Sequence, residues 1–317
     1  LFMTIDPENT VAGKLYENPR GRWHQWLVRI AALVAVLIAI VLPPLSLEQQ
    51  FWVILGPVAI FGLSHGGADP FILQQLVPKR PRALSLAMGV YFLAFLAFLL
   101  LVWFVPTIAL LVFLILSIWH FGFTDAAYLS APRNTLLMWL CGSLPVLGPI
   151  IGHPEQTGEL LAWLVSHEKN IVYALLTVVG PPLAALWLLG FGFLFFRHHR
   201  HLSARVPLEL ILVGAALVLL PPLLAFAFYF CLIHSVRHFL SITEYRLGQA
   251  EIKQVLGLLA RKTAPATLGA LAMALLVWGA IMFWSPTSNF LAEAVRVMFW
   301  GLAALTVPHG LVVKLWW

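Results

Sequence analysis

The chain has 317 residues, of which 61% are hydrophobic and only 10% are charged, and its mean hydropathy is +0.92. These values exclude a soluble globular domain. They predict an integral membrane protein with an all-α fold, because each helical crossing needs about 20 apolar residues. The net charge of +6 comes from Lys and Arg scattered over short polar stretches, so we expect no nucleic-acid partner.

Apolar segments fill the chain, with polar or Pro/Gly-rich stretches between them. We predict a polytopic transmembrane helix bundle of eight to ten crossings, with 26–317 as a single transmembrane catalytic domain and 1–25 as a polar tail. The count depends on Pro106, on Pro221-Pro222, and on whether 207–220 crosses only half of the membrane. The segments are 26–44, 50–66, 83–105, 107–123, 135–151, 170–196, 207–220, 223–243, 264–284 and 290–315.

Charges in the polar stretches indicate the orientation of the chain. Ten crossings place every cluster of Lys and Arg on the cytoplasmic side and the acidic 152–169 loop outside. We therefore expect a multi-pass protein of a bacterial or archaeal inner membrane, in contact with membrane lipid and with a cytoplasmic N-terminus. The alternating charges and apolar residues of 244–263 predict an amphipathic helix on the cytoplasmic surface.

Five of the eleven histidines lie within or at the ends of apolar segments, where ionisable side chains are costly and usually functional or paired. With ten crossings, their segments all run in one direction and place them at similar depth, which predicts one shared metal site in the bundle. These five are His65, His120, His234, His238 and His309. The remaining six are expected to be solvated or interfacial: His24, His153, His167, His198, His199 and His201.

His234 and His238 are four residues apart, so a helix presents both on one face, where they can bind one ion. Imidazole ligands suit zinc, copper, iron and nickel. Four neutral imidazoles would leave open positions for dioxygen on six-coordinate iron, which favours Fe(II). Arg237, between the paired histidines, points to another face and is expected to reach lipid headgroups.

Two aspartates follow motif histidines closely in the sequence. Asp69 lies four residues beyond His65, and Asp125 lies five beyond His120. A ligating histidine usually donates its second ring hydrogen to a carboxylate or carbonyl, so both aspartates are candidate anchors for the metal ligands. A helix end that meets water explains them equally well.

The motifs GLSHGGADP (62–70), SIWHFGFTD (117–125), HSVRH (234–238) and VPHGL (307–311) together resemble the Brp/Blh family of membrane-embedded β-carotene 15,15′-dioxygenases. The resemblance implies an iron(II) enzyme that cleaves the central double bond of β-carotene with dioxygen to give two retinal molecules, in some cases for a rhodopsin. It implies His65, His120, His234 and His238 as iron ligands. His309 matches the C-terminal motif and either binds iron or shapes the pocket.

A carotenoid is lipid-soluble and about as long as the hydrocarbon core is thick, so lateral entry between helices would suit it. Trp119, Phe121 and Tyr229, close to the motifs, are candidate pocket residues, although ordinary helix packing also accounts for such aromatic side chains. Two other functions remain open: a membrane carotenoid or lipid hydroxylase, ketolase or desaturase with two irons, and a transporter or proton conduit that uses intramembrane histidines.

Overall fold

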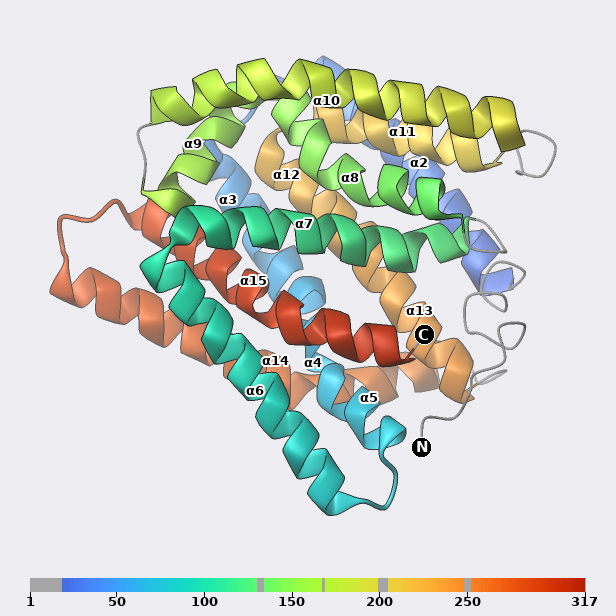
Figure 1. Cartoon of the computed structure of the whole chain (residues 1–317), viewed down its shortest axis with the longest axis vertical. Coiled ribbons are helices and arrows are strands. Elements are labelled where there is room, and N and C mark those ends of the chain that lie inside the picture. The colour runs from blue at the N-terminus through green and yellow to red at the C-terminus, as the bar shows by residue number, and fades with distance from the viewer. Residues whose placement is uncertain (1–18, 130–133, 167–168, 199–204, 248–251, 317) are drawn as a thin grey trace.

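The structure is a computed structural model, and it describes residues 19–129, 134–166, 169–198, 205–247 and 252–316. Within these ranges the chain is helical and has no strand (Figure 1). The elements are α2 (Pro19–Val41), α3 (Leu47–Pro57), η2 (Val58–Gly62), α4 (Leu63–Gly67), α5 (Asp69–Leu76), α6 (Pro81–Phe104), α7 (Pro106–Asp125), η3 (Ala126–Tyr128), α8 (Thr135–Gly152), α9 (Pro154–Val165), α10 (Lys169–His198), α11 (Arg205–Leu219), α12 (Pro222–Ala227), η4 (Phe228–His234), α13 (Ser235–Leu247), α14 (Ile252–Trp284) and α15 (Phe290–Trp316).

Nine helical segments of the described chain are long and apolar enough to cross a membrane. The prediction of an all-α bundle of eight to ten crossings is therefore confirmed, and the chain is a multi-pass membrane protein. The nine segments are Gly21–Val41, Leu47–Leu76, Pro81–Phe104, Pro106–Tyr128, Thr135–Gly152, Lys169–Arg197, Pro222–Ile242, Ala260–Trp284 and Phe290–Trp316.

The short helix α11 forms a tenth antiparallel segment. Its 15 residues extend only about 22 Å, less than the roughly 30 Å of a hydrocarbon core. At one end of the bundle, Lys169 at the start of α10 lies 3.9 Å from Glu159 of α9. At the same end, the His153 ring bonds to the carbonyl of Leu219, the last residue of α11, at 3.0 Å. Helix α10 therefore leaves this end and α11 returns to it (Figure 1).

A glutamine side chain joins three elements at this end. The Gln50 amide of α3 donates to the Leu45 carbonyl at 2.8 Å and to the Gln156 side chain of α9 at 2.9 Å. Its oxygen accepts from the backbone N–H of Leu223, in the first turn of α12, at 3.0 Å. Because that N–H has no partner within its own helix, Gln50 satisfies a group that would otherwise be costly to bury.

At both positions where the number of crossings was open, one helix ends and a proline begins the next. Pro106 is the first residue of α7, directly after α6 and the connecting Val105. Pro222 is the first residue of α12, and Pro221 precedes it in extended conformation. Proline is favourable at the first position of a helix, because that position needs no intrahelical N–H bond.

Two boundaries differ from the expectations. Helix α2 begins at Pro19, inside the range expected for the polar tail. The acidic 152–169 loop contains helix α9, which packs against α8, α10 and α15. In the 244–263 segment, residues 244–247 end α13 and residues 252–263 begin the long helix α14; residues 248–251 lie outside the described ranges, so a single amphipathic helix stays a prediction.

Helices α7 and α8 approach each other closely because glycines replace side chains where they cross. A Cβ on Gly122 of α7 would meet the backbone of Met138, and a Cβ on Gly142 of α8 would meet the backbone of Ile118 and Gly122. Small residues commonly permit such contacts between membrane helices. This crossing holds the His120 end of α7 against α8.

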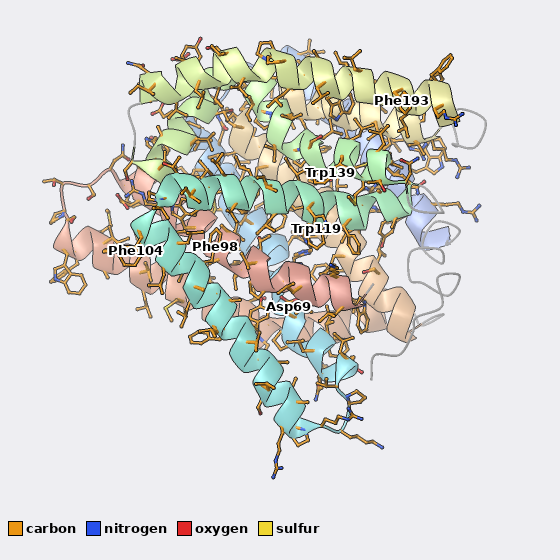
Figure 2. The ribbon with its side chains drawn as sticks, in the orientation of Figure 1. Asp69, Phe98, Phe104, Trp119, Trp139 and Phe193 are labelled. Atoms are coloured by element: carbon orange, nitrogen blue, oxygen red, sulfur yellow. The ribbon has the colours of Figure 1, made fainter. Side chains whose placement is uncertain are left out.

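Large apolar side chains cover the outside of the bundle. Phe104 at the end of α6 is 73% exposed, Phe193 on α10 is 60% exposed, and Figure 2 shows both pointing away from the helices around them. In water these side chains would be unfavourable, whereas acyl chains solvate them. The polar side chains of the site lie inside instead.

Candidate metal centre

Five histidine rings meet inside the bundle, and the ring of His65 lies among the others. Its centroid is 4.3 Å from that of His238, 4.4 Å from His309, 4.7 Å from His234 and 5.9 Å from His120. All five residues are buried. The rings come from α4, α7, η4, α13 and α15, so segments far apart in the sequence build one site.

Two π-helical turns adjoin these histidines. In η2, which directly precedes the helix of His65, the N–H of Leu63 bonds to the carbonyl of Val58. In η4, which ends at His234, the N–H of Ser235 bonds to the carbonyl of Phe230. Each turn has an i→i+5 bond that changes the direction in which side chains leave the helix, and such turns are frequent at functional sites.

The ring nitrogens form two groups that could hold a metal ion. One group is His65, His120 and His234, the other is His65, His238 and His309, and the ligand atoms within each lie no more than 4.8 Å apart. The Nε2 atoms of His120 and His234 are 3.0 Å apart. Two adjacent ligands at about 2.1 Å from one ion, at a right angle, have this separation.

Several ring nitrogens at this site are buried without a hydrogen-bond partner. They are both nitrogens of His65, both nitrogens of His238, Nδ1 of His120 and Nε2 of His309. Leaving so many polar atoms unpaired in a membrane interior is costly, and coordination to a metal ion removes that cost for the nitrogens that bind it. The residues present therefore fit a metal ion with imidazole ligands.

Two carboxylates orient two of the rings through the same arrangement. Asp69 Oδ1 lies 2.7 Å from Nδ1 of His309, and its Oδ2 accepts from the Tyr91 hydroxyl at 2.8 Å. The second arrangement contains Asp125, His234 and Tyr229. Since an ionised carboxylate only accepts, Nδ1 of each histidine donates and its Nε2 lone pair faces the site.

In the second arrangement, Asp125 Oδ2 lies 3.3 Å from Nδ1 of His234 and accepts from the Tyr229 hydroxyl at 2.6 Å. The two aspartates, predicted as anchors of metal ligands, therefore contact histidines from distant segments and not the histidines that closely precede them in the sequence. Asp125 is five residues beyond His120, which is about 140° away around a helix. Asp69 begins α5, after the chain has left α4 at Ala68.

Arg237 is buried, which corrects the expectation that it reaches lipid headgroups. It is 2% exposed and forms an ion pair with Glu209 of α11. Its second nitrogen lies 4.0 Å from Asp125 Oδ1. Because Arg237 lies closer to Glu209 than to Asp125, Asp125 Oδ2 remains available to His234. An Arg and a Glu inside apolar segments are usually paired, which was the available sequence signal.

Helix α2 packs against α11 and α13, the two helices that carry this ion pair, and also contributes polar groups. His24, expected at the membrane interface, is buried, and its Nε2 contacts the Leu232 carbonyl at 3.2 Å. The Gln25 amide donates to the carbonyl of Tyr128, whose hydroxyl donates to the carbonyl of Arg237 at 2.5 Å. The first crossing therefore closes the side of the site that carries His234 and His238.

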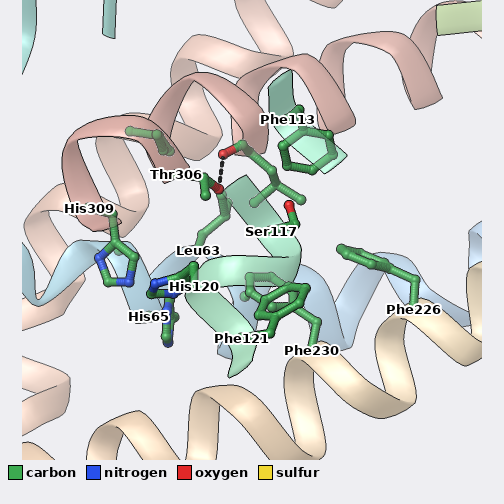
Figure 3. A pocket seen from close by; sticks show the side chains of 14 residues that line it. Leu63, His65, Phe113, Ser117, His120, Phe121, Phe226, Phe230, Thr306 and His309 are labelled. Carbon is green, nitrogen blue, oxygen red and sulfur yellow. Dashed lines mark hydrogen bonds between the residues drawn. The ribbon is translucent and has the colours of Figure 1, made fainter. Parts of the chain in front are cut away.

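A pocket reaches the histidines from the other side (Figure 3). It is partly open and includes His65, His120 and His309 in its wall. Phe113, Phe121, Phe226 and Phe230 contribute apolar surface. His234 and His238 are absent from the wall, so the pocket approaches the site from the face opposite these two histidines.

The three candidate pocket residues have different surroundings. Phe121 lines the pocket. Tyr229 instead bonds to Asp125, and Trp119 is partly exposed and stacks on Phe123 at 5.5 Å. Sequence reasoning missed Glu209, Tyr91 and Ser117, which lies in the pocket wall.

Comparison with known proteins shows which family the chain belongs to. A family model described as Beta-carotene 15,15′-dioxygenase matches residues 57–317. The chain belongs to this family. It is 30% identical over 279 residues to a Beta-carotene 15,15′-dioxygenase of an uncultured marine bacterium, 66A03, with 83% of this chain and 92% of the relative covered.

A second relative is the Probable beta-carotene 15,15′-dioxygenase Blh of Halobacterium salinarum. The two chains are 28% identical over 320 residues, with 90% of this chain and 89% of the relative covered. No solved structure matches this chain. The resemblance inferred from the histidine motifs is confirmed.

Proposed function

We propose that this protein cleaves the central double bond of β-carotene with dioxygen and releases two molecules of retinal. One observation carries the proposal: three histidines of a buried five-histidine cluster lie in the wall of an apolar pocket inside a membrane bundle. Membership of the β-carotene 15,15′-dioxygenase family supports this reaction rather than another reaction of a histidine-bound metal.

The reaction balances without a further reductant. The carbon–carbon double bond and the oxygen–oxygen bond break, and two carbon–oxygen double bonds form, with one oxygen atom on each product. Retinal is an aldehyde, so each half of the substrate gains one polar atom. The protein supplies position and exclusion of water.

We propose Fe(II) as the metal, held by His65, His120, His234 and His238, with His309 as a fifth ligand. Nε2 of His309 has no hydrogen-bond partner, and Nδ1 of the same ring bonds to Asp69; both observations support His309 as a ligand. Two carboxylates beside the rings balance the charge of a dication, while Arg237 and Glu209 neutralise each other. When bound, ferrous iron supplies the redox chemistry that lets dioxygen react with a polyene.

The substrate is expected to enter from the lipid. β-Carotene is a hydrocarbon rod, and the pocket that receives it is lined mainly by apolar side chains and lies among membrane helices. We further propose that the N-terminus is cytoplasmic and that the membrane is a bacterial or archaeal inner membrane. A rhodopsin that takes up retinal is the downstream partner implied by the product.

The test is to incubate purified, iron-loaded protein with β-carotene and dioxygen and to measure retinal by chromatography. We expect two retinal molecules per β-carotene and about one iron per chain. A protein with iron that leaves β-carotene intact would contradict the proposed substrate. Two irons per chain would contradict the single-ion site and favour a di-iron hydroxylase or desaturase.

The ligand assignment has its own test. His65→Ala, His120→Ala and His234→Ala are each expected to lower both iron content and retinal formation severely, since each removes a ligand. Replacing His153, which bonds to the Leu219 carbonyl at the distant end, should leave the iron content unchanged. Full iron content in the three site variants would refute the assignment.

A further inference from the structure

The pocket wall contains one polar group that neither the metal site nor the helix uses. Ser117 of α7 is 3% exposed, and its hydroxyl has no hydrogen-bond partner. Burying a hydroxyl without a partner is costly. A group of this kind inside a pocket indicates a ligand that completes it.

Other helical hydroxyls of this chain behave differently. Thr124 bonds to the His120 carbonyl at 3.1 Å, Ser143 to the Leu140 carbonyl at 3.3 Å, and Thr306 to the Leu302 carbonyl at 2.8 Å. Such bonds to the preceding turn are the usual solution for Ser and Thr within a helix. Ser235 is also buried without a partner, but it is not part of the pocket wall.

Ser117 lies where a reacting chain would pass. It precedes His120 by three residues on α7, so both side chains lie on one face, about 4.5 Å apart along the helix axis. In Figure 3 the three histidines are together at one end of the pocket, Phe113 and Phe226 are towards the other, and Ser117 lies between them. The hydroxyl is therefore beside the path that leads to the histidines.

We propose that the Ser117 hydroxyl donates a hydrogen bond to the aldehyde oxygen of retinal, the product of the proposed function on which this inference rests. β-Carotene carries no oxygen, so it cannot accept this bond. The acceptor arises only when an oxygen atom is joined to the central carbon. Because the bond is absent in the substrate complex, it favours the oxygenated states over the hydrocarbon.

The same pocket supplies a matched control. Thr306 also lines it, but its hydroxyl already donates to the Leu302 carbonyl of its own helix (Figure 3, dashed line). Ser117→Ala and Thr306→Val each remove one hydroxyl from the same wall. A general effect of losing a hydroxyl would appear in both variants, whereas loss of a bond between Ser117 and the ligand would affect only Ser117→Ala.

The experiment measures binding to the iron-loaded protein under nitrogen, so that nothing is oxidised. Quenching of tryptophan fluorescence gives the affinities for retinal and for β-carotene, and difference infrared spectroscopy gives the carbonyl stretch of bound retinal. We expect Ser117→Ala to weaken retinal roughly five- to tenfold and to raise the carbonyl frequency. Its affinity for β-carotene should stay within about twofold, and Thr306→Val should leave the carbonyl frequency unchanged and alter the affinities for retinal and β-carotene equally, if at all.

Ser117→Cys tests whether a structural effect explains the result, because a thiol still fills the space of the hydroxyl but is a weak donor. We expect the same direction of change in this variant, with unchanged iron content. Unaltered retinal affinity and carbonyl frequency in Ser117→Ala would overturn the inference, as would equal weakening of β-carotene. Wild-type protein that neither binds retinal nor cleaves β-carotene would overturn the proposed function as well.

Discussion

Asp69 and Asp125 perform the same task at two of the five histidines. Each accepts from a tyrosine hydroxyl with one oxygen, Oδ2, and each contacts Nδ1 of a histidine. The histidine therefore presents its other nitrogen to the site in a fixed tautomer. In both cases the histidine comes from a helix distant in sequence, so the aspartate also ties two segments together.

Replacing either aspartate by asparagine should weaken metal binding. In Asp125→Asn and Asp69→Asn the acceptor loses its charge, so His234 or His309 is held less firmly, and we expect a 10- to 100-fold lower metal affinity. A competition titration with a metal chelator measures it. The control is Glu293→Gln, which alters an ion pair with Arg296 elsewhere. Unchanged affinity in both asparagine variants would contradict the anchoring role.

Arg237 and Glu209 form an ion pair in the interior of the bundle. Removing only one partner leaves an unpaired buried charge, so Arg237→Met should cost about 3–5 kcal/mol of stability. The double variant Arg237→Met/Glu209→Met removes both charges and should recover most of that loss. Thermal unfolding in detergent measures the difference. Equal destabilisation in the single and double variants would show that the charges are not coupled.

At the scale of elements, the close crossing of α7 and α8 positions His120. Gly142 faces the backbone of Ile118, which lies within one turn of His120 on α7. A side chain at position 142 would push the two helices apart. Since the ligands of a metal must be held at defined distances, a small shift of α7 affects the whole site.

We therefore expect Gly142→Val to lower thermal stability by about 1–3 kcal/mol, the usual cost of overpacking, and to reduce the metal content. Gly279→Val is the matched control, since a Cβ at Gly279 of α14 meets nothing within 4 Å. Thermal unfolding and metal analysis of the two variants provide the measurement. Equal behaviour of the two variants would contradict the positional role of this crossing.

At the scale of the whole molecule, nine helical segments in the part of the chain that the structure describes are long enough to cross a membrane, and α11 adds a shorter one. The turn that contains Arg80, between α5 and α6, and the turn that contains Thr287, between α14 and α15, lie at opposite ends. The basic residues near Arg80 favour the cytoplasmic side for that end. Cys141 and Cys231 are buried, so the wild-type chain offers a low background for thiol labelling.

An impermeant thiol reagent applied to intact cells should label Thr287→Cys and leave Arg80→Cys unlabelled until the membrane is opened. Both positions are exposed, so access to the reagent depends on the side of the membrane. Retinal formation in each variant verifies that the fold is kept. Labelling of Arg80→Cys in intact cells would reverse the proposed orientation.

The sequence alone determined the class of the protein, the helical segments and the gathering of five histidines at one depth. The physical reason is local: apolar composition decides whether a segment enters the membrane, and position along a helix sets depth. The spacing of His234 and His238 predicted that both bind one ion, whereas the structure places them in different groups of candidate ligands that share His65.

The contacts between groups on different helices could be seen only in the folded structure. It paired Asp69 with His309 and Asp125 with His234, buried Arg237 against Glu209, and packed α2 against the helices that carry that pair. It also placed Ser117 in the pocket wall. These contacts depend on the rotation and separation of packed helices, on two π-helical turns and on glycine crossings, and spacing along the chain does not specify them.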